Sequence, residues 1–328
     1  MGDDGHERRN FPAQRFVEAG LDPADVYRVL DTALAEDLAY GPDATTDAIV
    51  PPTATVTATL GSRRAGVLAG VVVVEALLTT RLTDPRLTVQ LHDGDRVAPG
   101  DVVVTVRARA GELFTLERTA LNLVTHLSGI ATVTRAWVDA VAGTGCRIRD
   151  TRKTLPGLRT LEKYAVRCGG GVNHRMGLGD AVLIKDNHVA VAGSITAAMD
   201  AARAHAGHLP IEVEVDTFDQ LEEAIDARAD LVLLDNWTVD ECAKGVDRAC
   251  GTATRLESSG GLSLDDAAAY AATGVDFLAV GSLTHSVTAL DLGLDLGLDL
   301  GLDAGLDAGL DAGLEAGLDA GAGRGDRQ

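Results

Sequence analysis

The sequence predicts an α/β protein in which a mixed module of helices and strands precedes a domain of alternating strands and helices. Apolar residues make up 46% of the 328 residues and aromatic residues only 3%. The core must therefore consist mainly of Ala, Val and Leu, which suits a parallel sheet covered by helices. After Gly143, apolar strand-like runs recur and alanine-rich helical segments separate them. This rhythm predicts parallel strands joined by right-handed crossovers.

The first part of the chain divides into an extension and a mixed module. Residues 1–21 carry mixed charge with little pattern, and we expect a loose extension there. Asp22 and Pro23 start a helix, because aspartate caps helices and proline suits the first helical position. Residues 22–130 form an α+β module with alternating strand patterns near residues 53–59 and 102–106. Helical spacing returns at 111–141, as one long helix or two abutting ones.

Residues 131–288 form the second predicted domain. Its strands are expected at 147–150, 181–185, 211–215, 231–234, 254–257 and 277–280. This pattern fits either an open doubly wound sheet or a barrel.

Residues 289–328 form an acidic tail that repeats Gly-Leu-Asp-Leu and then Gly-Leu-Asp-Ala. A glycine at every fourth position costs a helix about 1 kcal/mol each relative to alanine. We therefore expect a solvated, disordered segment. Repeated glycine and aspartate also occur in calcium-binding β-rolls, but the nine-residue period and paired glycines of those repeats are absent.

Composition also excludes several classes of partner. A formal net charge of −20 argues against a surface for nucleic acid or anionic membrane. The first ten residues lack the apolar segment of a signal peptide, and the apolar stretch at 66–78 is too short to span a bilayer. The four cysteines show no C-x-x-C or zinc spacing. We expect a cytoplasmic protein with reduced thiols.

Polar residues gather at the carboxyl ends of the predicted strands, where parallel α/β folds place their sites. Cations follow the first two strands, acids the middle two, and glycine–serine turns the last two. A solvated rim and ordinary turns would be the alternative interpretation. However, Lys185 ends an apolar strand, where burial without an anionic partner is costly, and Glu214 lies inside another strand. The segregation indicates a ligand with anionic groups at two ends and hydroxyls or a metal between.

The sequence resembles the quinolinate phosphoribosyltransferase family, whose members are also called carboxylating nicotinate-nucleotide pyrophosphorylases. The resemblance runs from about Val26 to Leu290. It rests on motifs in unbroken order: ERTALN at 117–122, HLSGIAT at 126–132, DTRKTLPGLR at 150–159, GGGVNHR at 169–175, LIKDNH at 183–188, EVEVD at 212–216, LDN at 234–236, SGG at 259–261 and VGSLTH at 280–285.

The resemblance implies an N-terminal α/β-sandwich domain and an incomplete α/β barrel of about six parallel strands. It also implies Mg²⁺ dependence and a homodimer, open to further assembly, in which Arg118 of one subunit reaches the partner's site. The implied reaction joins quinolinate to phosphoribosyl pyrophosphate and gives nicotinate mononucleotide, pyrophosphate and CO₂. This is a step of de novo NAD biosynthesis.

The residues fit roles in this chemistry. Guanidinium forks bind carboxylates in a bidentate manner, so we assign the two quinolinate carboxylates to Arg118, Arg152, His174, Arg175 and Lys185. Catalysis is assigned to Lys153, Glu214 and Asp235. The lysine neutralises the departing pyrophosphate with Mg²⁺, while the two acids stabilise positive charge on the ribose and share the metal through water. The remaining substrate-binding residues are Thr151 and the 5′-phosphate set Ser259, Gly260, Gly261, Gly281 and Ser282.

Two other functions remain open at this point. A related transferase for another pyridine or base could use the same fold, although the His174-Arg175 pair favours quinolinate. A carrier is suggested by the turns around Gly94 and Gly100, which resemble a biotinyl or lipoyl domain. Such carriers need an exposed lysine in a hairpin, and no lysine precedes Lys153.

Overall fold

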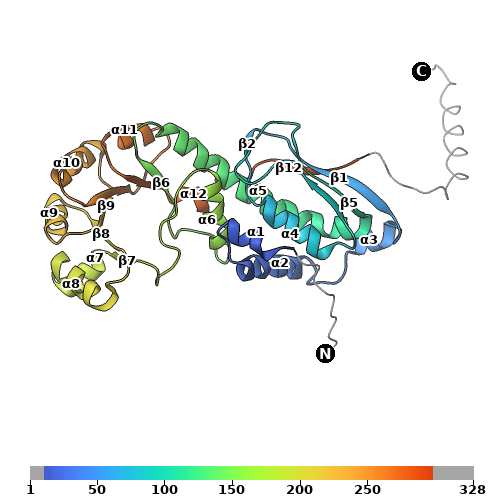
Figure 1. The fold of residues 1–328 in the computed structure, drawn as a ribbon, viewed down its shortest axis with the longest axis horizontal. Coiled ribbons are helices and arrows are strands. Elements are labelled where there is room, and N and C mark those ends of the chain that lie inside the picture. Colours follow the sequence, from blue (N-terminus) through green and yellow to red (C-terminus); the bar gives the residue numbers. More distant parts are fainter. Residues whose placement is uncertain (1–10, 298–328) are drawn as a thin grey trace, which may run out of the picture.

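The computed structural model describes residues 11–297, which form two lobes joined by a long helix (Figure 1). The helices are α1 (Ala13–Glu18), α2 (Pro23–Asp37), α3 (Ala44–Ile49), α4 (Val71–Arg81), α5 (Ala110–Ala140), α6 (Arg159–Cys168), α7 (Asp186–Ala192), α8 (Ile195–Ala206), α9 (Phe218–Asp226), α10 (Val239–Ala249), α11 (Ala267–Ala272) and α12 (Ser282–His285). The strands are β1 (Thr55–Ser62), β2 (Gly66–Val67), β3 (Arg86–Val89), β4 (Arg96–Val97), β5 (Val102–Arg109), β6 (Arg147–Arg149), β7 (Val182–Ile184), β8 (Ile211–Val215), β9 (Leu231–Asp235), β10 (Arg255–Ser259), β11 (Phe277–Ala279) and β12 (Leu292–Leu296).

Two predicted helices are confirmed in detail. The side chain of Asp22 accepts a hydrogen bond from the backbone N–H of Ala24 at 2.9 Å, and Pro23 is the first residue of α2. The helical region after Gly111 is one continuous helix, α5. It crosses the boundary that we expected between residues 130 and 131, so the two lobes share a helix at that point.

The N-terminal lobe is built on an antiparallel sheet with strand order β12-β1-β5-β3. Along β1, buried and half-exposed residues alternate, so Val56, Ala58 and Leu60 point into the core. Helices α4 and α5 cover that face, and α4 buries seven of its eleven residues. The lobe is thus the α/β sandwich that the resemblance implies.

The acidic tail does not begin where the sequence suggested. We expected disorder from residue 289, but Leu292–Leu296 form β12 and pair antiparallel with β1. Leu290 and Leu292 are buried. The expectation is therefore wrong for residues 289–297, because alternate leucines give this stretch an apolar face that closes the N-terminal sheet. Residues 298–328 lie outside the described part of the chain.

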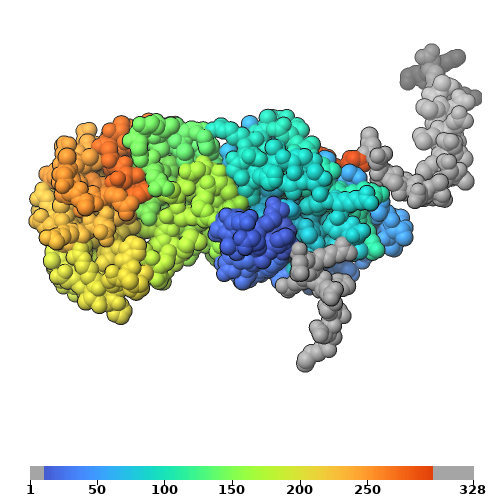
Figure 2. Space-filling view, viewed as in Figure 1, coloured from blue at the N-terminus to red at the C-terminus, as the bar shows by residue number. Residues whose placement is uncertain are grey.

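The N-terminal extension is also more ordered than we expected. Residues 11–21 contain α1, and Phe11, Phe16 and Leu21 are buried in the core. Carbonyl oxygens of Ala19 and Gly20 accept hydrogen bonds from the Arg167 guanidinium of α6. The N-terminal helices, blue in Figure 2, accordingly lie against the junction of the lobes. A loose extension is wrong for these residues, and residues 1–10 lie outside the described part.

The C-terminal lobe holds a six-stranded sheet with order β6-β11-β10-β9-β8-β7, and all of its pairs are parallel. The six predicted strands are confirmed. β6 and β7 are the two edges, so no strand pair within residues 11–297 closes the barrel. The helices that follow the strands, α8 to α11, lie along the outer side of the sheet (Figure 1). Of the two folds left open, the incomplete barrel is the observed one.

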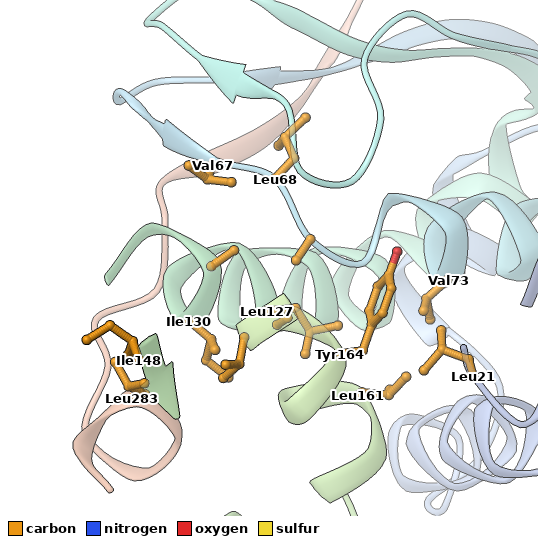
Figure 3. Close-up of a cluster of buried hydrophobic side chains, with 14 of the residues drawn as sticks. Leu21, Val67, Leu68, Val73, Leu127, Ile130, Ile148, Leu161, Tyr164 and Leu283 are labelled. Atoms are coloured by element: carbon orange, nitrogen blue, oxygen red, sulfur yellow. The ribbon is translucent and has the colours of Figure 1, made fainter. Parts of the chain in front are cut away.

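A continuous apolar core connects the lobes. Leu127 and Ile130 of α5, Leu161 of α6, Ile148 of β6 and Leu283 of α12 belong to one cluster of buried side chains, in which Ile148 lies beside Leu283 (Figure 3). Among the described residues, no helix is long and apolar enough to cross a membrane. The shared core thus packs α5 and α6 of the lobe junction against each other.

Candidate active site

A cavity of about 560 Å³ opens at the carboxyl ends of the parallel strands. Eleven of the fourteen predicted substrate-binding residues line it. These are Thr151, Arg152, Lys153, His174, Arg175, Lys185, Glu214, Asp235, Ser259, Gly260 and Gly261. The other lining residues are Leu183, Leu233, Asn236, Glu257 and Ala279. Parallel topology explains the convergence, because every strand ends at the same edge of the sheet.

Two guanidinium groups form one wall of the cavity. The Nε atoms of Arg152 and Arg175 are buried and have no hydrogen-bond partner among residues 11–297. Burial, and then the neighbouring charge of Arg152, lowers the pKa of Arg175. Two like charges held close together at a half-buried site are stabilised by an anion of matching geometry. This wall is therefore suited to a ligand with more than one carboxylate.

His174 has a defined tautomer. Its Nδ1 accepts the backbone N–H of Arg175 at 2.7 Å, so Nδ1 carries no proton. Its Nε2 lies 3.0 Å from Glu212 Oε2 and must be the protonated nitrogen that donates to it. We counted His174 among the cations from the sequence, and this hydrogen-bond pattern corrects that assignment. The imidazole is neutral in this arrangement, which leaves four cationic side chains of the chain itself on the cavity.

Buried acids lie behind His174. Glu257 pairs with Arg149, and its Oε1 lies 3.7 Å from His174 Nε2. Burial, and then the charge of Glu212, raises the pKa of Glu257 to about 8. We assigned neither acid a role from the sequence. The signal was present, since both lie inside strands whose two faces are covered.

The cluster of His174, Glu212 and Glu257 has the composition of a metal site. Its ligand atoms lie within 4.8 Å of one another. A metal-bound histidine donates its second ring nitrogen to an acceptor, whereas here the second nitrogen of His174 accepts a backbone N–H. Metal at Nε2 would require a fully deprotonated ring. The cluster is therefore better described as a hydrogen-bonded support for His174.

A second part of the cavity lining is acidic and carries Glu214 and Asp235. Lys185 Nζ forms an ion pair with Glu214, which meets the expectation that this lysine has an anionic partner. Burial, and then the charges of Glu214 and Asp216, raises the pKa of Asp235. Around Asp235, the negative charges of the carboxylates therefore outnumber the positive charges of the neighbouring lysines. Oxygen donors with surplus negative charge suit a hard divalent cation or sugar hydroxyls.

The turn after β10 needs glycine. Gly260 has φ of +95°, and a Cβ there would lie 2.2 Å from Asn236 Oδ1. The backbone N–H of Asn236 in turn donates to Ser259 O at 2.8 Å. The strand ends of β9 and β10 are thereby fixed together, and the backbone of this turn faces the cavity without a side chain in the way.

Three predicted residues do not line the cavity. Gly281 lies next to it, since a Cβ at this position would be 2.9 Å from Lys153 Cδ. Ser282 follows it as the exposed first residue of α12. Arg118 is exposed on α5, and no hydrogen bond or ion pair is formed by it within residues 11–297. The roles assigned to these three residues stay predictions.

Comparison with known proteins identifies the family. Residues 43–128 match the profile "Quinolinate phosphoribosyl transferase, N-terminal domain", and residues 130–295 match the corresponding C-terminal domain. The chain belongs to the quinolinate phosphoribosyltransferase family. A relative from Mycobacterium leprae, named nicotinate-nucleotide pyrophosphorylase [carboxylating], is 56% identical over 265 residues, which is 80% of this chain and 93% of that protein.

Further relatives agree. A probable nicotinate-nucleotide pyrophosphorylase [carboxylating] from Bacillus subtilis is 44% identical over 69% of this chain and 78% of its own length. The crystal structure of NadC from Streptococcus pyogenes is similar with a TM-score of 0.80 and 38% identity, covering 84% of this chain and 99% of that chain. Human nicotinic acid phosphoribosyltransferase has a TM-score of 0.51 at 15% identity, which shows a shared fold alone.

Proposed function

We propose that this quinolinate phosphoribosyltransferase family member transfers a phosphoribosyl group from phosphoribosyl pyrophosphate to quinolinate. The products are nicotinate mononucleotide, pyrophosphate and CO₂, and the reaction belongs to de novo NAD biosynthesis. The observation that carries the proposal is the cavity at the strand ends, which is lined both by Arg152 and Arg175, whose Nε atoms have no partner among the described residues, and by the acids Glu214 and Asp235. A pyridine dianion matches the first wall and a ribose with its leaving group matches the second.

The cationic wall holds and orients quinolinate. Arg152 and Arg175 each present a planar fork that binds one carboxylate, and Lys185, the ion-pair partner of Glu214, lines the same cavity as a third positive group. His174 is neutral and donates from Nε2 to Glu212, so its part is to fix the position of Arg175 through the backbone. With both carboxylates bound, the pyridine nitrogen is aimed at C1 of the ribose, which converts a bimolecular encounter into an oriented one.

The acidic wall serves the sugar. Departure of pyrophosphate builds positive charge on the ribose ring, as at other glycosyl centres. Glu214 and Asp235 stabilise that charge through space and bind ribose hydroxyls. Lys153, whose side chain lies against Gly281, neutralises the departing pyrophosphate. No side chain has to form a covalent intermediate. Loss of CO₂ breaks the bond between C2 of the ring and its carboxylate. The positive charge of the quaternised nitrogen next to C2 stabilises the electron pair left on that carbon, which then takes up a proton.

We propose Mg²⁺ as the cofactor. The donor set fits, because Glu214 and Asp235 offer carboxylate oxygens, and burial together with the negative charge of Glu214 raises the pKa of Asp235. When bound there, Mg²⁺ supplies positive charge to the pyrophosphate. We also propose a homodimer, because Arg118 is exposed and forms no hydrogen bond or ion pair with the other residues of the range 11–297. All four cysteines are free thiols, which supports a reducing, cytoplasmic location.

The test is a turnover assay with two substrates. Purified protein with phosphoribosyl pyrophosphate and Mg²⁺ should release CO₂ from quinolinate. It should use quinolinate at least a hundredfold better than nicotinate, judged by kcat/KM. A missing carboxylate leaves buried guanidinium charge unpaired, at a cost of ~2–5 kcal/mol. Comparable values for the two substrates would contradict the assignment and favour a transferase for another pyridine.

A further inference from the structure

Two adjacent charged residues of α6 are completely buried. Glu162 and Lys163 are both 0% exposed, although α6 otherwise serves as a packing helix beneath the cavity. Buried ion pairs seldom stabilise a fold more than apolar residues of similar size would. Core packing alone therefore does not account for these two side chains.

The two residues contact opposite ends of one loop. Glu162 Oε2 accepts the backbone N–H of Leu155 at 3.0 Å. Lys163 Nζ forms an ion pair with Asp150. Between these two points lie residues 151–154, which include Arg152 and Lys153 of the cavity. We call residues 150–155 the anion loop.

Each contact also extends to a second element. Lys163 Nζ donates to the carbonyl oxygen of His174 at 2.9 Å, and Asp150 Oδ1 accepts the backbone N–H of the same residue at 2.8 Å. The segment that carries His174 and Arg175 is thus fixed to the anion loop. Glu162 Oε1 lies 2.8 Å from His126 Nε2. This second contact connects the loop to α5, which carries Arg118.

We propose that Glu162 and Lys163 are positioning residues that hold the anion loop and the His174 segment in the binding geometry before substrate arrives. The need for such a restraint follows from charge. Arg152 and Arg175 repel each other in the free enzyme, and an unrestrained loop would move them apart. Holding them together in advance removes an ordering cost from substrate binding. This inference rests on the proposed function, since its effect is measured as affinity for quinolinate.

The variants separate positioning from stability. Glu162→Leu removes the acceptor for the Leu155 N–H and fills the same buried space with an apolar side chain of similar size. Glu162→Gln keeps an oxygen that can accept the Leu155 N–H, so this variant should retain the affinity for quinolinate. Tyr164→Phe is the matched control: it removes a buried hydrogen bond of the same helix, from the Tyr164 hydroxyl to Asp93 at 2.7 Å, but touches no residue of the anion loop.

We expect Glu162→Leu to raise KM for quinolinate at least tenfold with kcat within about threefold. Glu162→Gln should stay within about threefold of the parent in KM. Tyr164→Phe should lower Tm but leave KM within about twofold. An unchanged KM in folded Glu162→Leu, or an equal rise in KM in Tyr164→Phe, would overturn the proposal.

A measurement on the unmodified enzyme covers the case in which Glu162→Leu does not fold. Hydrogen–deuterium exchange should show slow exchange at the Leu155 amide without substrate, and no further slowing when quinolinate is added. Fast exchange that slows only with quinolinate would overturn the proposal, because the substrate would then order the loop. An enzyme that restrains this loop yet does not turn over quinolinate would instead contradict the proposed function.

Discussion

The C-terminal boundary of the folded part gives a quantitative prediction. A chain ending at Leu290 removes β12, whereas a chain ending at Gly297 keeps it. β12 pairs with β1 through five residue pairs, from Leu292 opposite Ser62 to Leu296 opposite Ala58. The first truncation therefore exposes an edge of the N-terminal sheet and opens part of its core.

The magnitude follows from two leucines. Leu292 is 6% exposed, and Leu294 contacts the apolar gap between the sheet and helices α4 and α5. Complete burial of a leucine contributes about 1.5–3 kcal/mol, so one buried and one half-buried leucine contribute ~3 kcal/mol. The free energy gained from the hydrogen bonds of β12 roughly offsets the conformational entropy that is lost when this segment becomes a strand. For a folded part of this size, a loss of ~3 kcal/mol lowers Tm by roughly 5 °C.

The assay compares both truncated chains with the full chain. Thermal unfolding and urea unfolding should show the loss only for the chain ending at Leu290, together with increased binding of an apolar dye. The chain ending at Gly297 should keep its Tm and should keep activity within about twofold, because the glycine-rich repeat beyond it predicts no packed core. Equal Tm values for the two truncations would refute the assigned strand pairing. A large loss of activity at Gly297 would show that the repeat matters to the enzyme.

Three further predictions address the site. Arg118→Ala and Glu214→Ala chains, each inactive alone, should regain one functional site per heterodimer when mixed; no recovery despite subunit exchange would place the site within one chain. Arg175→Lys should raise KM for quinolinate at least tenfold but not KM for phosphoribosyl pyrophosphate, because an ammonium lacks the bidentate fork; steady-state kinetics distinguish the two. Glu257 has a pKa raised to about 8 by burial, so its contribution to stability is complete below the ordinary carboxyl range and is lost as pH rises toward about 8. Glu257→Gln should flatten the fall in unfolding free energy between about pH 5 and about pH 8, and an unchanged slope would count against the shift.

Local pattern alone predicted the start of α2 and the parallel strands of the C-terminal lobe. Asp22 and Pro23 marked the start of α2, and the strand-helix rhythm after Gly143 gave all six parallel strands. Because parallel strands end at one edge, reading the residues at their ends was enough to predict eleven lining residues of the cavity. Family motifs then identified the chemistry that these residues serve.

The missed features all depend on contacts between distant residues. The leucines at 290–296 alternate with a period of two, which is a strand signal, but the four-residue repeat that follows obscured it. Only β1, more than two hundred residues earlier, makes this segment a strand. In the same way Phe11 and Phe16 gave no periodic pattern, and it is packing against the lobe junction that orders them.

The sequence by itself determined which residue types reach the cavity, because strand and helix periods are local and parallel topology then fixes the shared edge. Only the tertiary structure decided their chemical states and supports. The tautomer of His174 depends on a backbone N–H and on Glu212, and the anion loop depends on two buried side chains of α6. Protonation and loop geometry are set by burial and by partners far apart in the chain, and neither leaves a periodic signal in the sequence.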